Sequence, residues 1–311
     1  MSAREHATAF APASVGNVAI GFDILGFSVD ALGDTVKVLR RGAPGVAIGA
    51  VRGVAGELPH EARDNTAGRA LLALEEAVRP GFGFVLEIDK GIPLGSGLGG
   101  SAASAVAAVV AANVLLPTPC SREQLLKFAM AGEAVASGSL HLDNIAASLY
   151  GGLVLTVGID EPRVKQIPVP AGIRAIIVHP HMFLATAAAR ALLKGSVELS
   201  DFVWQTANLA GFISGCYTDD LDMIRASLED VVIEPQRQAL IPGFQEVRRA
   251  AMRAGALGCS ISGAGPAIFA WALEPSAPAV LETMRREFAS RGLPSDGWIV
   301  DMRRAGARVI A

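Results

Sequence analysis

A glycine-rich segment at residues 91–104, GIPLGSGLGGSAAS, carries the clearest pattern for binding chemistry in the sequence. It follows a predicted strand and precedes a predicted helix, so successive backbone N–H groups and the positive end of the helix can converge on an anion. Glycines let the backbone approach a ligand without a Cβ atom in the way. Phosphate is the favoured ligand, and Ser101, at the helix start, could bind a phosphate-bound Mg²⁺. A glycine turn without a ligand is the alternative.

Two other nucleotide-binding patterns fit this segment poorly. No Lys follows the glycines, so the segment is not a G-x-x-x-x-G-K-[ST] loop. A dinucleotide-binding unit needs an acidic residue about 20 positions further on, after a strand and a helix. Glu123 lies instead near the start of a predicted helix, which weakens the dinucleotide interpretation.

A second cluster, PASVGNVAIGFDILG at residues 12–26, interleaves three glycines with Asn17 and Asp23. The Asn side chain offers a donor and an acceptor, and the Asp carboxylate only accepts. Together they could hold an amino or hydroxyl group of a ligand. The alternative is a turn in which both side chains cap the local backbone.

A third group consists of Glu133 and the segment HLDN at residues 141–144. A phosphoryl donor needs Mg²⁺, hard oxygen ligands and a group that orients the acceptor hydroxyl, and Glu133, Asp143 and Asn144 are of the right type. The alternative is helix capping by Asp143 or Asn144, with Glu133 in solvent. His141 alone is more typical of a structural histidine than of a base.

Two arginines and one further turn complete the candidates. Arg190 lies four residues after Thr186, and Arg237 lies in EPQRQALIPGF. Each guanidinium could bind a substrate carboxylate through two parallel hydrogen bonds, or could simply be a surface group. The segment SISGAGPAIFA, residues 260–270, is a tight turn between two predicted strands that could supply N–H groups near residues 12–26, or could be a turn without function.

Hydrophobic periodicity predicts a scaffold of alternating strands and helices for these residues. In the first half we expect strands at 34–40, 83–90 and 151–158. We expect helices at 66–78, at 105–116 and from 121 to about 136, and then a short helix that ends at Tyr150. Ser121 and Gln124 form a capping box for the third of these helices. In the second half we expect strands at 173–179 and 297–304, helices at 219–230, 244–256 and 277–290, and two strands within 259–272.

Composition excludes several classes of function. The 311 residues are 51% hydrophobic, and their formal charge of −3 gives no basic surface for nucleic acid or an anionic membrane. Cys120, Cys216 and Cys259 are widely spaced, which argues against zinc and for a reducing, cytoplasmic location. The longest apolar run, residues 102–116, is shorter than the roughly 20 residues of a membrane span, and the start has no signal-peptide pattern.

The motifs, in this order, resemble the GHMP kinases, with matches near residue 12, in GLGGSAAS and in SGAGPAIFA. The resemblance covers essentially the whole chain. EAVASGSLHLDNIAASLYGG and IEPQRQALIPGF resemble the branch that phosphorylates L-homoserine. The resemblance implies a two-part α+β fold, with an N-terminal domain like ribosomal protein S5 domain 2 at residues 1–170 and a ferredoxin-like sandwich at 171–311. It also implies a homodimer that uses ATP and Mg²⁺ in threonine biosynthesis.

The same resemblance assigns roles to residues of this sequence. The phosphates of ATP would lie on the loop formed by Pro93, Gly95, Ser96, Gly97, Leu98, Gly99, Gly100 and Ser101, and the base near Asn65. Mg²⁺ would be held by Ser101 and Glu133. The amino and hydroxyl groups of the substrate would lie among Asn17, Asp23, His141, Asp143 and Asn144, and its carboxylate would be held by Thr186, Arg190 and Arg237.

One departure and three alternatives remain. The family loop usually reads GLGSS, whereas Gly100 replaces the first serine here, so we expect a changed affinity for ATP rather than an inactive site. A loose phosphoryl-transfer transition state asks little of a base, so we expect Asp143 to position the substrate. The alternatives are a kinase for another small alcohol such as mevalonate, a non-catalytic metabolite-binding protein of the same fold, and a dinucleotide-dependent oxidoreductase.

Overall fold

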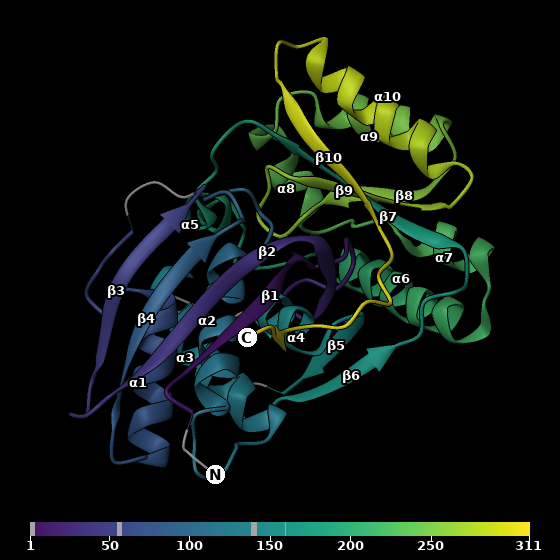
Figure 1. The fold of residues 1–311 in the computed structure, drawn as a ribbon. Helices are drawn as coiled ribbons and strands as arrows, with labels where there is room; N and C mark the ends of the chain where they lie inside the picture. Colours follow the sequence, from purple (N-terminus) through teal and green to yellow (C-terminus); the bar gives the residue numbers. More distant parts are fainter. Residues whose placement is uncertain (1–3, 55–57, 138–141, 159) are drawn as a thin grey trace.

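The chain folds into two β-sheets with helices packed on both, as the computed structural model in Figure 1 shows for residues 4–54, 58–137, 142–158 and 160–311. The α+β class expected from the sequence is confirmed. No helix within those residues is both long enough and apolar enough to cross a membrane.

The first sheet has the strand order β11-β1-β2-β4-β3. Its strands are β1 (His6–Gly16), β2 (Leu25–Arg41), β3 (Val46–Gly53), β4 (Gly83–Lys90) and β11 (Arg308–Val309). β2 is long enough to pair with β4 near its end and with β5 (Leu153–Val157) near its start, and β6 (Arg163–Ile167) pairs with β5. Only β3 and β4 run parallel among these described pairs.

Four helices accompany this sheet, and α2 and α4 pack directly on β1 and β2. They are α1 (Thr66–Val78), α2 (Gly100–Asn113), α3 (Arg122–Ser137) and α4 (Leu142–Tyr150). α2 is rich in alanine, and every second residue of β1 from Ala7 to Ala13 is a fully buried alanine. Small side chains on both elements let the helix lie close to the strand, which brings the glycine segment before α2 next to the end of β1.

The second sheet has the order β10-β7-β9-β8 and is antiparallel throughout. Its strands are β7 (Ile173–Pro180), β8 (Ala256–Ile261), β9 (Ile268–Leu273) and β10 (Ser295–Val300), and α9 (Phe244–Arg253) and α10 (Ala277–Ala289) cover its outer face. Side chains of a strand alternate between faces. Ile176 and Val178 accordingly pack toward α9 and α10, while Ala175 and Ile177 join the core of the first sheet.

Four helices lie between β7 and α9. They are the 20-residue α6 (Leu199–Thr218) and the shorter α5 (Thr186–Ala191), α7 (Leu221–Ser227) and α8 (Glu234–Arg237), and α8 leads into the 3₁₀ turn η1 (Gln238–Leu240). The inner face of the second sheet meets β2 and α6 at a cluster of aromatic rings, where Phe27 lies edge-on to Phe269 and Trp271, and Phe212 also contacts Trp271.

The sequence predictions were correct for most of the regular elements. The helix at 66–78 and the strand at 83–90 are confirmed at both ends, and the capping box is present, since Gln124 N donates to Ser121 Oγ (3.3 Å) and Ser121 N to Gln124 Oε1 (2.8 Å). The helix expected at 105–116 begins earlier, at Gly100, because Gly99 adopts a left-handed conformation (φ 67°) and starts the helix at once. The helix expected at 219–230 is shorter, because Asp220 caps it and the chain leaves the helix at Leu228.

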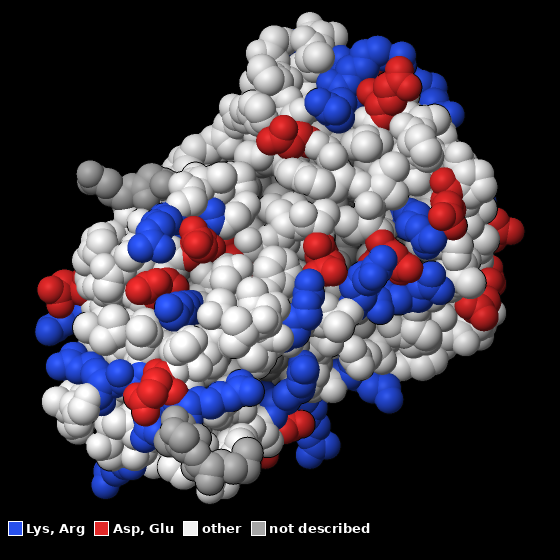
Figure 2. All heavy atoms as spheres, viewed as in Figure 1, with Lys and Arg blue, Asp and Glu red and all other residues white. Residues whose placement is uncertain are grey.

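The predicted border near residue 170 lies between β6 and β7, and β11 returns to the first sheet from the far end of the chain. The division into residues 1–170 and 171–311 therefore stays a prediction. Figure 2 shows basic and acidic side chains interspersed over the face in view, in keeping with the small net charge of −3.

Candidate active site

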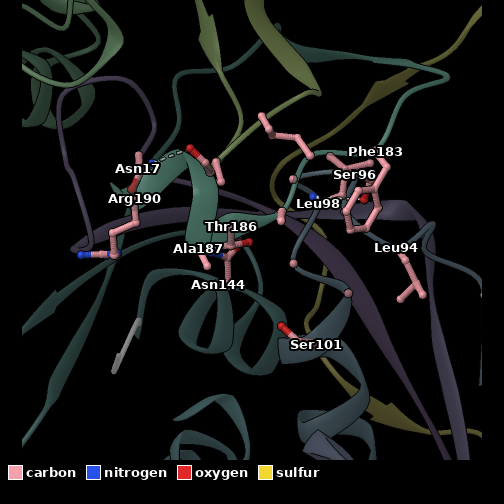
Figure 3. Close-up of a pocket in the computed structure, with 18 of the residues that line it drawn as sticks. Asn17, Leu94, Ser96, Leu98, Ser101, Asn144, Phe183, Thr186, Ala187 and Arg190 are labelled. Atoms are coloured by element: carbon pink, nitrogen blue, oxygen red, sulfur yellow. Dashed lines mark hydrogen bonds between the residues drawn. The ribbon is translucent and has the colours of Figure 1, made fainter. Parts of the chain in front are cut away.

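A pocket of about 360 Å³ opens where the glycine segment, the turn between β1 and β2 and the connection after β7 come together (Figure 3). Its volume lies at the lower end of the range for small-molecule sites. Most of the residues singled out in the sequence line it, namely Asn17, Asp23, Pro93, Gly95, Ser96, Gly97, Leu98, Gly99, Gly100, Ser101, Glu133, Asp143, Asn144, Thr186, Arg190 and Arg237.

The glycine segment forms a tight loop between β4 and the first turn of α2. Gly95, Gly97 and Gly99 have φ values of 63°, 77° and 67°, which L-residues with a Cβ atom adopt only at a cost. A Cβ atom on Gly97 would also lie 2.6 Å from the carbonyl oxygens of Ser262 and Gly265. The loop is thus pressed against the turn after β8, and its backbone is shaped to receive a ligand rather than to present side chains.

Ser101 and Glu133 face each other in this pocket. Ser101 Oγ, in the first turn of α2, donates to Glu133 Oε2 on α3 at 2.7 Å, and Glu133 is only 8% exposed. The alternative of a solvated Glu133 is therefore wrong. One carboxylate and one hydroxyl beside the glycine loop are of the type that fits Mg²⁺, which usually takes one or two protein oxygens and completes its shell with phosphate oxygens and water.

A strained turn follows β1. Asn17, Val18 and Ala19 have φ values of 70°, 46° and 60°, and Asp23 has 62°. Left-handed backbone is costly for L-residues, above all for a β-branched one such as Val18. Such strain persists only where surrounding contacts hold it, and it is typical of functional sites.

The contacts that hold the turn converge on Asn17. Its backbone N–H donates to Asp143 Oδ2 (3.0 Å), its Nδ2 donates to Gly263 O (2.9 Å), and its Oδ1 accepts from Asp23 N (3.1 Å). The last bond is the local cap expected as the alternative, and the other two join three distant segments. The turn after β8 does lie beside residues 12–26, as predicted, since Gly263 N donates to Gly16 O (3.1 Å).

Asp143 and Asn144 occupy the first turn of α4. Asp143 is 1% exposed, and its two oxygens accept from Asn17 N (3.0 Å) and Asn144 N (2.8 Å). Asn144 Oδ1 accepts from Ser14 Oγ (2.9 Å) on β1. Because these bonds fix both side chains against β1, the two groups have the orientation that positioning of a ligand requires.

The two arginines line the pocket, and both lie close to the Phe22 ring. Arg190 Nη2 donates to both oxygens of Asp23 (2.9 and 2.7 Å), and Arg237 donates to Ala189 O and Gly263 O (3.2 Å each). Each guanidinium carbon is 5.2 Å from the ring centre of Phe22. Burial lowers the pKa of Arg237, and the nearby charge of Arg190 lowers it further. Two guanidinium groups that are partly shielded from water can bind a carboxylate.

One predicted residue lies outside the pocket, and another lies outside the described residues. Asn65 is the N-cap of α1: its Oδ1 accepts from Ala67 N and Gly68 N and its Nδ2 donates to Pro59 O, so its side chain holds the local backbone and lies outside the pocket. The geometry thus gives no support to a contact between Asn65 and the nucleotide base. His141 lies outside the residues that the structure describes.

Sequence reasoning missed several residues at the site. Some line the pocket, and two others, Phe22 and Ser14, contact side chains that line it. Phe22 is the most informative, because an aromatic residue directly before Asp23 in a glycine-rich turn is a usable signal for a cation partner. Phe183 is 67% exposed and lies at the pocket, against Gly95. Ser14, Gly263 and Ala264 carried no distinctive pattern, since their roles depend on which segments meet in space.

A strand, a glycine loop and a helix that open onto a pocket lined by carboxylate and hydroxyl oxygens are typical of phosphate-binding enzymes. Comparison with known proteins agrees: the models for the GHMP kinases N terminal domain and the GHMP kinases C terminal match residues 65–152 and 212–290. The chain belongs to the GHMP kinase family, and its similar relatives include proteins named homoserine kinase.

Two of these relatives come from Xanthomonas campestris pv. campestris and Xylella fastidiosa. The first is 51% identical over 98% of this chain and 94% of its own length, the second 50% identical over 99% and 95%. A solved homoserine kinase from Cytophaga hutchinsonii is 42% identical and superposes with a TM-score of 0.95 over 100% of this chain and 99% of its own. The GHMP kinase fold predicted from the sequence is confirmed.

Proposed function

We infer that this chain is a kinase that transfers the γ-phosphoryl group of ATP to the side-chain hydroxyl of L-homoserine. The observation that carries the inference is that one pocket joins a phosphate loop to a pair of arginines, with polar groups between them. In Figure 3, Asn144 and Thr186 lie between Arg190 and the loop residues Ser96 and Ser101. A small molecule with a carboxylate at one end and a hydroxyl near the loop fits this order.

Different residues of the pocket would bind the phosphates, the metal ion and the polar groups of the substrate. The loop backbone and the N-terminus of α2 would hold the phosphates, and Arg190 and Arg237 the carboxylate of homoserine. Asp23 and Asp143 are the carboxylates suited to its ammonium group, and Asn144 to its hydroxyl. Ser101 and Glu133 would hold Mg²⁺, which neutralises charge on the β- and γ-phosphates when bound.

In the reaction, a bond forms between the hydroxyl oxygen and the γ-phosphorus, the bond from that phosphorus to the ADP oxygen breaks, and the hydroxyl proton is released to solvent. The main contribution of the protein is to align these groups and stabilise their charge. Asp143 is positioned by two backbone N–H groups, and we assign it the role of orienting the substrate.

Three finer statements are part of this proposal. The product, O-phospho-L-homoserine, would serve threonine biosynthesis; the protein would act in the cytoplasm; and it would form a homodimer. They are supported by the resemblance to the homoserine kinase branch.

The test is ADP release by the purified protein with ATP and Mg²⁺, comparing L-homoserine with mevalonate, galactose, L-serine and no acceptor. We expect strong stimulation by L-homoserine alone, because mevalonate and galactose lack the ammonium group and L-serine is one methylene shorter. Stimulation by mevalonate or galactose would keep the fold and overturn the substrate. No stimulation at all would favour the metabolite-binding alternative.

A further inference from the structure

A buried ion pair lies behind the glycine loop, outside the residues that line the pocket. It joins Asp34 on β2 to Lys90, the last residue of β4, and their side chains are 0% and 2% exposed. Because ions lose most of their hydration on burial, such a pair often contributes less stability than apolar residues of the same size would. Its presence under the loop therefore calls for a reason other than stability.

The Lys90 ammonium reaches the far end of the loop. Its Nζ donates to Gly100 O at 2.7 Å, to Ser104 Oγ at 2.8 Å and to Asp34 Oδ2. These three contacts match the three donors of an ammonium group. Gly100 and Ser104 are in the first turns of α2, so Lys90 ties the end of β4 to the start of the helix across the whole loop.

The Asp34 carboxylate holds the near end. Its Oδ1 accepts from the backbone N–H groups of Gly91 (3.1 Å) and Ile92 (3.2 Å), the first two residues after β4. Its Oδ2 accepts from Ser104 Oγ at 2.6 Å and from Lys90. The network of Asp34, Lys90 and Ser104 thus makes hydrogen bonds to both ends of the loop. A fully hydrogen-bonded buried network favours a single conformation.

We propose that Asp34 and Lys90 are positioning residues that hold the glycine loop in its phosphate-binding shape. This rests on the proposed binding of ATP to the loop. Neither side chain lines the pocket, so both act through the backbone of residues 91–100.

The decisive variant is the double change Asp34→Asn with Lys90→Met. It removes both charges together, so no buried ion is left unpaired, and the new amide oxygen can still accept from the backbone. We expect a melting temperature close to that of the wild type, since replacing a whole buried pair is often tolerated. By calorimetry with ATP and Mg²⁺ in the absence of acceptor, we expect about tenfold weaker binding of ATP, with the KM for L-homoserine changed less than about threefold.

Two further variants complete the design. Asp222→Asn with Arg225→Met removes an exposed ion pair on α7, whose side chains are 91% and 51% exposed, and should leave both constants unchanged. Ser104→Ala keeps both charges and removes the hydroxyl that bonds Lys90 and Asp34. It tests the proposal if the double variant does not fold, and we expect it to bind ATP about threefold more weakly.

Wild-type affinity for ATP in a folded double variant, or in Ser104→Ala if the double variant fails to fold, would show that the network is only structural and overturn the proposal. Failure of the wild-type protein to bind ATP would instead overturn the proposed function, so the two failures are distinguishable.

Discussion

Arg237 is oriented before any ligand arrives, because two of its N–H groups already bind the carbonyls of Ala189 and Gly263. It is 3% exposed, so the possibility that it is an ordinary surface residue is wrong. Arg190 differs, since it shares the bidentate bond with Asp23 and is 31% exposed at its side chain. The two arginines therefore offer one fixed and one adaptable partner for a carboxylate.

Replacement Arg237→Leu should raise the KM for L-homoserine far more than the KM for ATP. One lost charged hydrogen-bonding partner corresponds to roughly 1.5–3 kcal/mol, or about 10- to 150-fold in binding. Steady-state kinetics with each substrate varied in turn measures both constants, and Arg225→Leu, on the exposed face of α7, is the control. Equal changes in the two constants would remove Arg237 from the carboxylate site.

Glu234, at the start of α8, makes the stability depend on pH. Burial raises its pKa from 4.5 to about 7, against the opposing effects of the Ser260 hydroxyl and Arg248. An acid whose pKa is higher in the folded state binds its proton more tightly there. The stability that it contributes is present below about pH 4.5 and is lost as the pH rises through about 7.

The variant Glu234→Gln cannot ionise, so it should gain stability relative to the wild type between pH 5 and 8, by roughly 3 kcal/mol at most. Urea denaturation of both proteins at several pH values within that range measures the difference. If the plots of unfolding free energy against pH for the two proteins stay parallel over the whole range, Glu234 ionises normally in the folded protein.

Two positions of the glycine loop, Gly97 and Gly100, should respond in opposite ways when a side chain is added. Gly97→Ala places a Cβ atom 2.6 Å from two carbonyl oxygens at a φ of 77°, and should destabilise the protein by on the order of 2 kcal/mol and weaken ATP binding. The matched Gly100→Ser places its Cβ atom 3.2 Å from Ile92 Cγ2 in ordinary helical backbone.

The serine restores the hydroxyl that this loop lacks, so Gly100→Ser should fold and bind ATP up to about tenfold more tightly. Calorimetric titration of both variants with ATP and Mg²⁺ gives the comparison. An affinity for Gly100→Ser below that of the wild type would mean that Ile92 cannot move aside and that glycine is required there.

The elements that the sequence predicted are those whose patterns are local. The helix at 66–78 and the strand at 83–90 show clear periodicity, and the capping box of Ser121 and Gln124 depends on residues three apart. The pocket's main residues were also found, because phosphate loops and oxygen ligands leave recognisable residue types. What local pattern could not predict was that Asp34, Lys90 and Ser104 meet beneath the loop.

The missed elements owe their structure to neighbours. β1 is lined with alanines, which have little preference for strands, and they serve the close approach of α2. In α6, Gly211 and Gly215 reduce helix propensity, yet a Cβ atom at either would lie 2.4 Å from Ser227 Oγ or 2.9 Å from Ile224 Cγ1 of α7. These glycines permit two helices to pack, which a single segment does not reveal.

The two sheets share one hydrophobic core, which extends from the alanines of β1 to Phe269 and Trp271 of β9. A smaller core lies between the second sheet and α9 with α10. The aromatic cluster around Phe27 crosses from one sheet to the other, so the larger core joins the two sheets. The pocket lies between parts that are held together by this shared packing.

We therefore expect the whole chain to unfold in one transition. Trp271 is fully buried in the shared core, so tryptophan fluorescence and far-ultraviolet circular dichroism should change at the same denaturant concentration. Phe27→Ala should shift both signals together by about 3–5 kcal/mol, whereas Phe202→Ala, at a residue 59% exposed, should shift neither. Separate transitions in the wild type would show two independent units.

The left-handed turn at residues 17–19 limits how this enzyme could be adapted to heat. Each of its residues carries a backbone penalty of about 1–2 kcal/mol, so glycine at Ala19, where only a methyl group is lost, would relieve strain. The same change would loosen the bond between Asn17 and Asp143, so turnover should fall as heat tolerance rises; an Ala19→Gly variant with a higher Tm and an unchanged kcat would disprove this. Thermal adaptation of this fold would then have to proceed through the distant second core, where rigidity and catalysis do not compete.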